Sequence, residues 1–255
     1  MSHGGPPKGT GTRRKDRRVA APALTAAAAR TIIGAVSSRL RLDVVIPARN
    51  AERTLGDVLD RAALREIRSL VVVDRGSTDA TAGVARDLGA VVLREPSGGY
   101  GAACLRALAH FAAQPEPPAV IAFAPGDAQL SADDLGRLVA PIVDGHAELT
   151  IGAGRERWVR DRVLSRLIDT VYGHRFGHPG PVRAVRYPAL VALGMSDRGA
   201  GWDVEMLVRA LKLGLGIVEV DVGGGVGSDG RGGVKDACIA GGRSLFHIVR
   251  HATVR

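Results

Sequence analysis

Short apolar runs alternate with helix-forming segments over much of this chain, and this alternation restricts the fold more than any other feature. Five runs have the length and the β-branched content of buried strands: residues 42–47, 69–73, 90–94, 119–124 and 149–153. Helical patterns separate them. They cover residues 51–63, a segment that follows Ser77 or Thr78 and ends at Leu88, and residues 100–113 and 132–144. This order predicts an α/β fold with a mostly parallel sheet and helices on both faces.

The alternation becomes less regular after residue 154. Two more strands are expected at residues 182–187 and 217–222, and three more helices at 159–172, 201–213 and 235–251. Seven of the eleven residues 223–233 are Gly, which predicts a mobile segment. The chain is therefore expected to divide into a basic arm at 1–41, an α/β domain at 42–222, and a Gly-rich loop with a basic helix at 223–255.

The net charge of +9 is concentrated in the arm, because residues 1–41 contain nine Lys or Arg and one acidic residue, a sum of +8. Such an arm is suited to an anionic lipid surface, or serves only as a solubilising tail. Nucleic acid is not expected as a partner, because no aromatic residues are interleaved with the basic ones to stack on bases.

The cysteines and the hydropathy pattern indicate the compartment. Cys104 and Cys238 are far apart and form neither a metal-ligand spacing nor a disulfide framework, which fits a reducing cytoplasm. The sequence contains no run of about 18 uncharged apolar residues, so no transmembrane helix is predicted. A cytoplasmic protein is expected, with peripheral contact to the inner face of an anionic membrane through the arm and residues 235–255.

Ligands of open α/β sheets bind at the carboxyl ends of the strands, near the point where the strand order reverses. Three loops follow expected strands there, at residues 47–50, 74–79 and 125–127. The sequence therefore predicts that a binding site forms where these loops meet.

Six segments in a fixed order resemble those of family 2 glycosyltransferases: residues 44–50, 71–81, 95–103, 123–129, 180–186 and 201–206. The last two resemble acceptor-side segments of the polyprenyl-phosphate branch, which includes dolichyl-phosphate mannosyltransferase. The resemblance implies a GT-A fold and inverting transfer of a sugar from a nucleoside-diphosphate sugar to a lipid-phosphate or small acceptor. It also implies Mg²⁺ or Mn²⁺ at the diphosphate leaving group.

The resemblance assigns nucleotide binding to seven residues: Pro47, Ala48, Arg49, Asn50, Asp74, Ser77 and Gly101. For three of them a structural role is the alternative. Pro47 can end a strand, Asp74 can cap the following turn, and Ser77 or Thr78 can cap the next helix.

Asp127 matches the metal-binding carboxylate nearest the cation, and Pro125 replaces the first Asp of that motif, so weak metal binding is expected. The alternative for Asp127 is a turn cap. His178 stands where relatives carry an acid and is a candidate base or metal ligand. Glu205 matches an acid that would orient the acceptor or a basic partner. Asp203 is expected to point elsewhere on the same helix.

Arg183 and Arg186 are predicted to share one strand face and to bind an acceptor or donor phosphate, with surface solvation as the alternative.

Three departures from the family pattern leave a second function open. Pro125 removes a metal ligand, Gly98 replaces a basic residue, and glycine dilutes the basic loop at residues 228–235. The alternative to an active glycosyltransferase is a catalytically degenerate relative that binds a nucleotide sugar or a protein partner without turnover. The third alternative is a membrane or nucleic-acid binder that acts through the arm.

Overall fold

The computed structural model describes residues 41–60, 63–153, 176 and 181–223. Several expected features lie outside these residues: the arm up to residue 40, the helices at 159–172 and 235–251, most of the Gly-rich segment, and His178.

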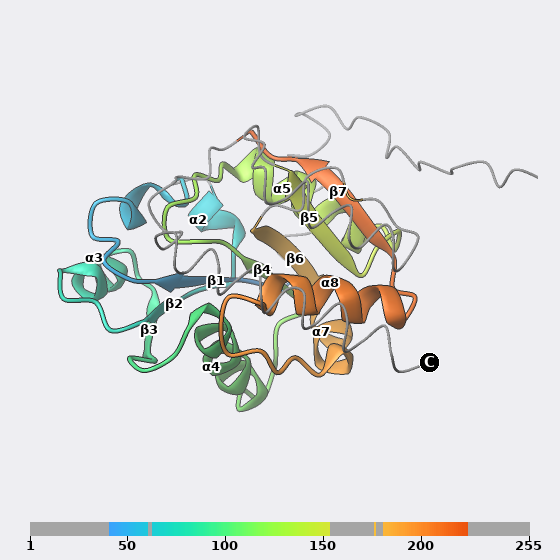
Figure 1. The fold of residues 1–255 in the computed structure, drawn as a ribbon. Helices are drawn as coiled ribbons and strands as arrows, with labels where there is room; N and C mark the ends of the chain where they lie inside the picture. Colours follow the sequence, from blue (N-terminus) through green and yellow to red (C-terminus); the bar gives the residue numbers. More distant parts are fainter. Residues whose placement is uncertain (1–40, 61–62, 154–175, 177–180, 224–255) are drawn as a thin grey trace, which may run out of the picture.

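The described strands form one sheet in the order β3-β2-β1-β4-β6-β5-β7 (Figure 1). Their bounds are β1 Leu42–Ala48, β2 Ser69–Asp74, β3 Val91–Arg94, β4 Val120–Phe123, β5 Leu149–Ala153, β6 Val182–Arg186 and β7 Ile217–Asp221. Neighbouring strands are parallel except at β6, which is antiparallel to both β4 and β5. The predicted α/β fold with a mostly parallel sheet is confirmed.

Helices cover both faces of this sheet, as expected. The described ones are η1 Leu55–Asp57, α2 Ala63–Glu66, α3 Thr81–Asp87, α4 Tyr100–Ala112, α5 Ala132–Val143, α7 Tyr187–Leu193 and α8 Trp202–Lys212. The apolar core on one face includes side chains of η1, α2, α3 and α5, and the core on the other face includes those of α4, α7 and α8.

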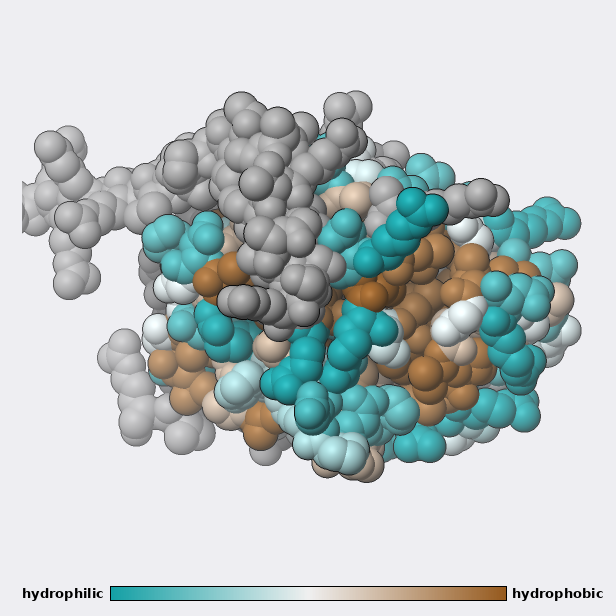
Figure 2. Space-filling view, turned by 180° about the vertical axis from the view of Figure 1, so that it is seen from behind, coloured by the Kyte–Doolittle hydropathy of each residue, from teal (hydrophilic) through white to brown (hydrophobic). Residues whose placement is uncertain are grey.

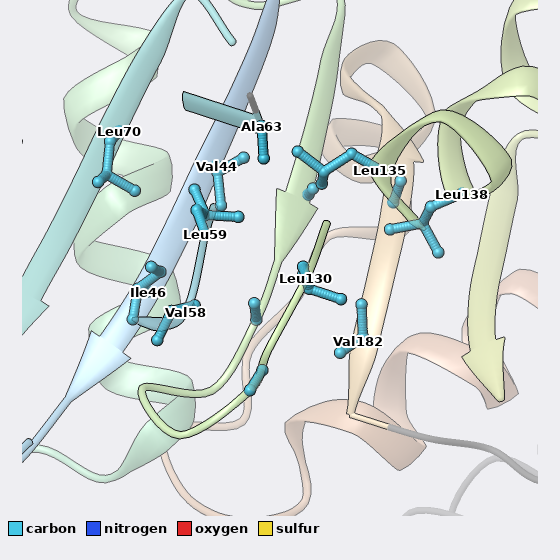
Figure 3. Close-up of a cluster of buried hydrophobic side chains, with 14 of the residues drawn as sticks. Val44, Ile46, Val58, Leu59, Ala63, Leu70, Leu130, Leu135, Leu138 and Val182 are labelled. Atoms are coloured by element: carbon cyan, nitrogen blue, oxygen red, sulfur yellow. The ribbon is translucent and has the colours of Figure 1, made fainter. Parts of the chain in front are cut away.

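The two cores follow from the alternation of side chains along each strand. In β1, Val44 and Ile46 belong to one core and Val45 to the other. Figure 3 shows the first core, in which aliphatic side chains of the sheet meet those of Leu130 and Leu135. Because the sheet is covered on both faces, apolar residues occupy consecutive positions of each central strand, which produces the continuous apolar runs in the sequence.

The helix expected at residues 51–63 is wrong, because this segment contains only η1 and reaches α2 at its end. The backbone of this segment is used in another way: Leu59 forms an isolated parallel bridge with Leu130. The N–H of Leu130 donates to the carbonyl of Val58 (2.8 Å), and the N–H of Asp60 donates to that of Leu130 (3.2 Å). This pairing holds the chain after β1 alongside the chain after β4.

A short helix at Tyr187–Leu193 was also not expected from the sequence, which placed Tyr187 at the end of a strand. Pro188 lies in the first turn of this helix. Backbone N–H groups there have no acceptor within the helix, so proline, which lacks an N–H, is tolerated.

The strand order reverses between β1 and β4, because β2 and β3 extend the sheet on one side of this pair and β6, β5 and β7 on the other. The carboxyl ends of β1, β2 and β4 therefore lie at the same edge, beside the reversal point. The three loops singled out from the sequence leave the sheet there.

Few large apolar side chains of the described part are exposed: Val91, Val191 and Leu213. Figure 2 shows the reverse face, where hydrophobic surface gathers on one side and hydrophilic side chains lie beside it. Among the described helices, none is long and apolar enough to span a bilayer.

A buried ion pair connects the amino ends of the central strands, opposite the three loops. The Asp43 side chain is fully buried and accepts hydrogen bonds from Nε (2.8 Å) and Nη2 of Arg68. Arg68 also donates to the carbonyl of Glu116 (2.8 Å), in the loop before β4. One guanidinium thus joins the segments that enter β1, β2 and β4, and its pKa is raised by the hydrogen bond to Asp43.

We expect Asp43→Asn to lower the free energy of unfolding by about 2–3 kcal/mol, because it leaves the guanidinium without its counter-charge. Urea denaturation measures the loss. The control is Glu116→Gln, which breaks an exposed pair with Arg41 and should cost less than about 0.5 kcal/mol. Equal effects of the two changes would contradict the structural role of Asp43.

Candidate functional site

Hydrogen bonds join the loop after β1 to the loop after β2. The N–H of Asn50 donates to Ser77 Oγ (3.0 Å), and the Asn50 side-chain oxygen accepts from the N–H of Thr78 (2.9 Å). Asn50 has a φ of 51°, a left-handed conformation that Asn tolerates better than most residues. The N–H of Ala51 donates to the hydroxyl of Thr81 (2.8 Å).

Two acidic side chains complete this connection in a reciprocal way. Asp79 accepts from the N–H of Glu52 (3.1 Å), and Glu52 accepts from the N–H of Ala80 (3.1 Å). We refer to these cross-loop bonds, between residues 50–52 and 77–81, as the loop clamp. The hydroxyl of Thr81 lowers the pKa of Asp79, so this carboxylate is ionised at neutral pH.

The loop clamp changes the roles expected for several residues. Ser77 and Thr78 do not cap α3, which begins at Thr81 with Ala80 as its N-cap. Asn50 and Ser77, expected to bind nucleotide, use polar atoms to join the loops. Residues 78–81 of the clamp belong to the family-like segment at 71–81, whereas Ala51 and Glu52 were expected only as the start of a helix.

The other residues expected to bind nucleotide lie at the same edge. Pro47 and Ala48 are buried within β1, so Pro47 does not end the strand, while Arg49 is exposed beyond it. The buried Asp74 ends β2, where its Oδ1 accepts from the N–H of Ser77 (2.8 Å). Asp74 thus has the turn-capping role that was its alternative.

The turn after β4 packs directly against the end of β1. A Cβ on Gly126 would lie 3.3 Å from Ala51 Cβ and 3.4 Å from Ala48 Cβ, so glycine permits this contact. The carbonyl of Gly126 accepts from the hydroxyl of Thr54 (2.7 Å). Asp127 follows, half-buried. The structure thus brings the turn that carries Asp127 beside the loop clamp.

The donor set around Asp127 limits how a metal could be held. In the part of the chain that the structure describes, no three His, Cys, Asp or Glu side chains gather as metal ligands. A cation at Asp127 would take its remaining ligands from diphosphate oxygens and water, which suits Mg²⁺ because Mg²⁺ retains several waters. The residues present fit a cation bound together with a diphosphate.

The Gly-rich first turn of α4 contacts another segment of the same chain, at residues 197–199. The N–H groups of Gly101 and Ala102 donate to the carbonyls of Gly199 (2.9 Å) and Arg198 (3.0 Å). A Cβ on Gly101 would lie 2.0 Å from the carbonyl oxygen of Asp197. This close approach accounts for glycine at 101, for which nucleotide binding was expected, and it occupies N–H groups that a phosphate could otherwise use.

Glu205 is fully buried on α8 and faces the same segment. Its carboxylate accepts from the hydroxyl (2.6 Å) and the N–H of Ser196, from the N–H of Asp197 (2.7 Å), and from Arg209 (2.9 Å). Burial raises the pKa of Glu205, but the hydrogen bonds and the charge of Arg209 outweigh it, and the pKa is lowered. Arg209 lies one turn later on the same helix and pairs with this carboxylate.

The prediction that Arg183 and Arg186 share a face is wrong, because residues three apart on a strand point to opposite faces. Arg183 is buried and donates to the carbonyl of Asp203 (2.6 Å), with its Nε 3.5 Å from that carboxylate. Arg186 donates to the carbonyl of Ile142 on the other face. Arg183 therefore does not have the solvent-exposed role that was its alternative, whereas Arg186 is half-buried.

Asp203 and Glu205 diverge on α8, as the sequence predicted. Glu205 faces the segment after α7, and Asp203 faces Arg183. Burial raises the pKa values of Tyr100 and Cys104 on α4, and the negative charge of Asp203 contributes to both shifts. This interaction has no signature in the local sequence because it joins residues about 100 positions apart.

Residues 43–183, more than half of the chain, match the profile of Glycosyl transferase family 2. The chain belongs to this family. An uncharacterized glycosyltransferase of Mycobacterium tuberculosis is 36% identical over 201 residues, which are 75% of this chain and 88% of that protein. Glycosyltransferase AglJ of Haloferax volcanii is 25% identical, over 68% of this chain and 59% of that protein.

A solved structure has the same fold. Glucosyl-3-phosphoglycerate synthase from Mycobacterium tuberculosis, in complex with Mn²⁺, UDP and phosphoglyceric acid, matches with a TM-score of 0.75. The match covers 92% of this family 2 chain and 84% of the synthase, at 20% identity. This likeness confirms the GT-A fold that the sequence motifs implied.

We expect Gly101→Ala to destabilise the protein by about 2–3 kcal/mol, because the new Cβ would collide with the backbone at Asp197. Thermal or urea unfolding tests this. Gly83→Ala is the matched control, since Gly83 lies within α3 with nothing near its absent Cβ. It should stabilise by about 0.5–1 kcal/mol. Similar destabilisation by both would contradict the close approach at Gly101.

The lowered pKa of Glu205 predicts a pH-dependent contribution to stability. This contribution is complete above the unfolded-state pKa near 4.5 and is lost as the pH falls through the lower folded-state value. The stability difference between the unaltered protein and Glu205→Gln should therefore be constant above about pH 5 and shrink in more acid solution. Urea unfolding across this range measures it, and Asp87→Asn, at an exposed site, is the control. A difference that does not change with pH would refute the shift.

Proposed function

We propose that this chain binds a nucleoside-diphosphate sugar where the loops after β1, β2 and β4 converge, and transfers the sugar to an acceptor with inversion. The observation that carries the proposal is the loop clamp together with the packing of Gly126 on Ala48 and Ala51. These contacts hold the three loops together at the reversal point of the sheet. Asp127, which is half-buried, follows Gly126 in the sequence and therefore lies beside them.

In this proposal the nucleoside lies against the backbone at residues 47–50 and near Asp74, and the diphosphate lies toward Asp127. Mg²⁺ or Mn²⁺, held by Asp127 and the diphosphate, would neutralise charge on the leaving group. Pro125 supplies no side-chain ligand, so we expect weaker metal binding than two carboxylates would give.

Known relatives guide the choice of probes. The synthase of Mycobacterium tuberculosis was solved with UDP-glucose and Mn²⁺, and also with UDP and Mg²⁺. It also holds phosphoglyceric acid, a small phosphorylated acid. We therefore propose a phosphate-bearing acceptor for this chain, either a small phosphorylated acid or a polyprenyl phosphate. A polyprenyl phosphate would accept the sugar on a phosphate oxygen that is already anionic near neutral pH, so its transfer would need no strong side-chain base, whereas a hydroxyl acceptor on a small phosphorylated acid would need one. Assays with phosphoglyceric acid and with a detergent-dispersed polyprenyl phosphate distinguish the two.

A second candidate is a relative that binds a nucleotide sugar or a protein partner without turnover. Two observations favour it. Pro125 removes a metal ligand, and the buried carboxylate of Glu205 is engaged by the protein itself rather than presented to an acceptor.

Isothermal titration with UDP-glucose and GDP-mannose, with Mn²⁺ and then with chelator, tests the donor site. We expect metal-dependent binding of one donor, weakened at least about tenfold by Asp127→Asn, because the variant loses the charged ligand. Asp87→Asn, at the exposed end of α3, should bind like the unaltered protein.

The outcomes separate the candidates. Metal-dependent binding followed by transfer supports the active enzyme, and binding without transfer to any acceptor supports the second candidate. Absence of binding by folded protein would contradict the donor site itself. Unchanged binding by Asp127→Asn would contradict the metal role of this residue.

A further inference from the structure

The segment at residues 195–199, which connects α7 to α8, contacts two helices, α4 and α8. We name it the bridging loop. On one side, its carbonyls accept hydrogen bonds from the first turn of α4, at Gly101 and Ala102. A Cβ on Gly99 would lie only 2.7 Å from Arg198 O, so the two backbones are in close contact.

On the other side, α8 holds the bridging loop through two charged residues one turn apart. Glu205 accepts the N–H groups of Ser196 and Asp197 and the Ser196 hydroxyl. Arg209 donates to the carbonyl of Leu193 (2.9 Å) and to Ser196 Oγ (3.2 Å). The carboxylate of Glu205 is fully buried, so its bonds to Ser196 and Asp197 are partly shielded from water, whereas the bond from Arg209 to Ser196 is exposed.

The start of α8 in turn contacts the strand that leads to Asp127. Trp202 is buried and meets Phe123 of β4 edge-on, with ring centroids 6.2 Å apart. Asp203 follows Trp202 and pairs with Arg183 of β6. Through α8, the bridging loop is thus connected to the strand that leads to the turn after β4.

We infer that Glu205 is a positioning residue, which holds the α8 half of the site against the β4 turn through the bridging loop and transfers no proton itself. The inference rests on the proposed function, and it places the acceptor beside the start of α8, the α8 half, because residues 201–206 resemble acceptor-side segments of the family. The proposed donor site lies elsewhere, at the loop clamp and Asp127. Loss of Glu205 should therefore impair transfer while leaving donor binding intact, since misplacement by about 1 Å can reduce a rate about 100-fold.

Hydrogen exchange of the amides tests the positioning without any activity. In Glu205→Ala, the amides of Gly101 and Ala102 should exchange at least about tenfold faster, because their acceptors move with the bridging loop. Glu205→Gln, which keeps one acceptor oxygen and the side-chain shape, should have an intermediate effect and guards against global unfolding of the alanine variant.

The matched control is Glu148→Gln. Glu148 also holds a loop amide, that of Gly216 (2.7 Å), before β7. This control should accelerate exchange at Gly216 and leave Gly101 and Ala102 unchanged. Unchanged exchange at Gly101 and Ala102 in Glu205→Ala would overturn the inference whatever the activity.

Kinetics and titration then test the functional half. For both Glu205 variants we expect the donor Kd within about twofold of the unaltered protein, kcat lowered at least about tenfold in Glu205→Ala, and an unchanged shape of the kcat–pH profile. A lost limb of that profile in Glu205→Gln would show a proton-transfer role and overturn the inference. Unaltered kcat in both variants would overturn it too. Absence of transfer by the unaltered protein would count against the proposed function, whereas the exchange result judges the bridging loop alone.

Discussion

The hydrogen bonds between the loop after β1 and the loop after β2 determine what this edge of the sheet can do. Parallel strands bring both loops to one edge, but strands alone leave loop amides without partners. Here the side chains of Asn50, Ser77 and Asp79 satisfy amides of the opposite loop. These bonds restrict the conformations of both loops, which lowers the conformational entropy that a ligand bound there would have to remove.

The α8 side of the site depends on a different kind of contact, between backbones. Gly99 and Gly101 lie where another segment approaches: a Cβ at Gly99 would lie 2.7 Å from the carbonyl oxygen of Arg198, and one at Gly101 would lie 2.0 Å from that of Asp197. Polar groups that looked available for a ligand in the sequence are thus engaged by the protein.

Features that arise from local sequence pattern were predicted, whereas those that arise from contacts between residues far apart in the sequence were not. Strands such as β2 were located to within a residue, because burial on both faces produces continuous apolar runs. The helix expected at residues 51–63 failed because the bridge from Leu59 to Leu130 outweighs local helical preference. Contacts such as those of Gly101 with Gly199 have no local signature at all. The convergence of three loops was predictable because it follows from strand polarity, whereas the partners of Glu205 and Arg183 were not.

The central claim is that a nucleoside diphosphate and a divalent cation bind together beside Asp127. Paramagnetic broadening of amide NMR signals by Mn²⁺ in the presence of UDP tests it most directly. We predict broadening centred on residues 126–128 and extending to 48–51, which depends on UDP and disappears in Asp127→Asn. Broadening centred elsewhere, or none with folded protein and saturating UDP, would contradict it.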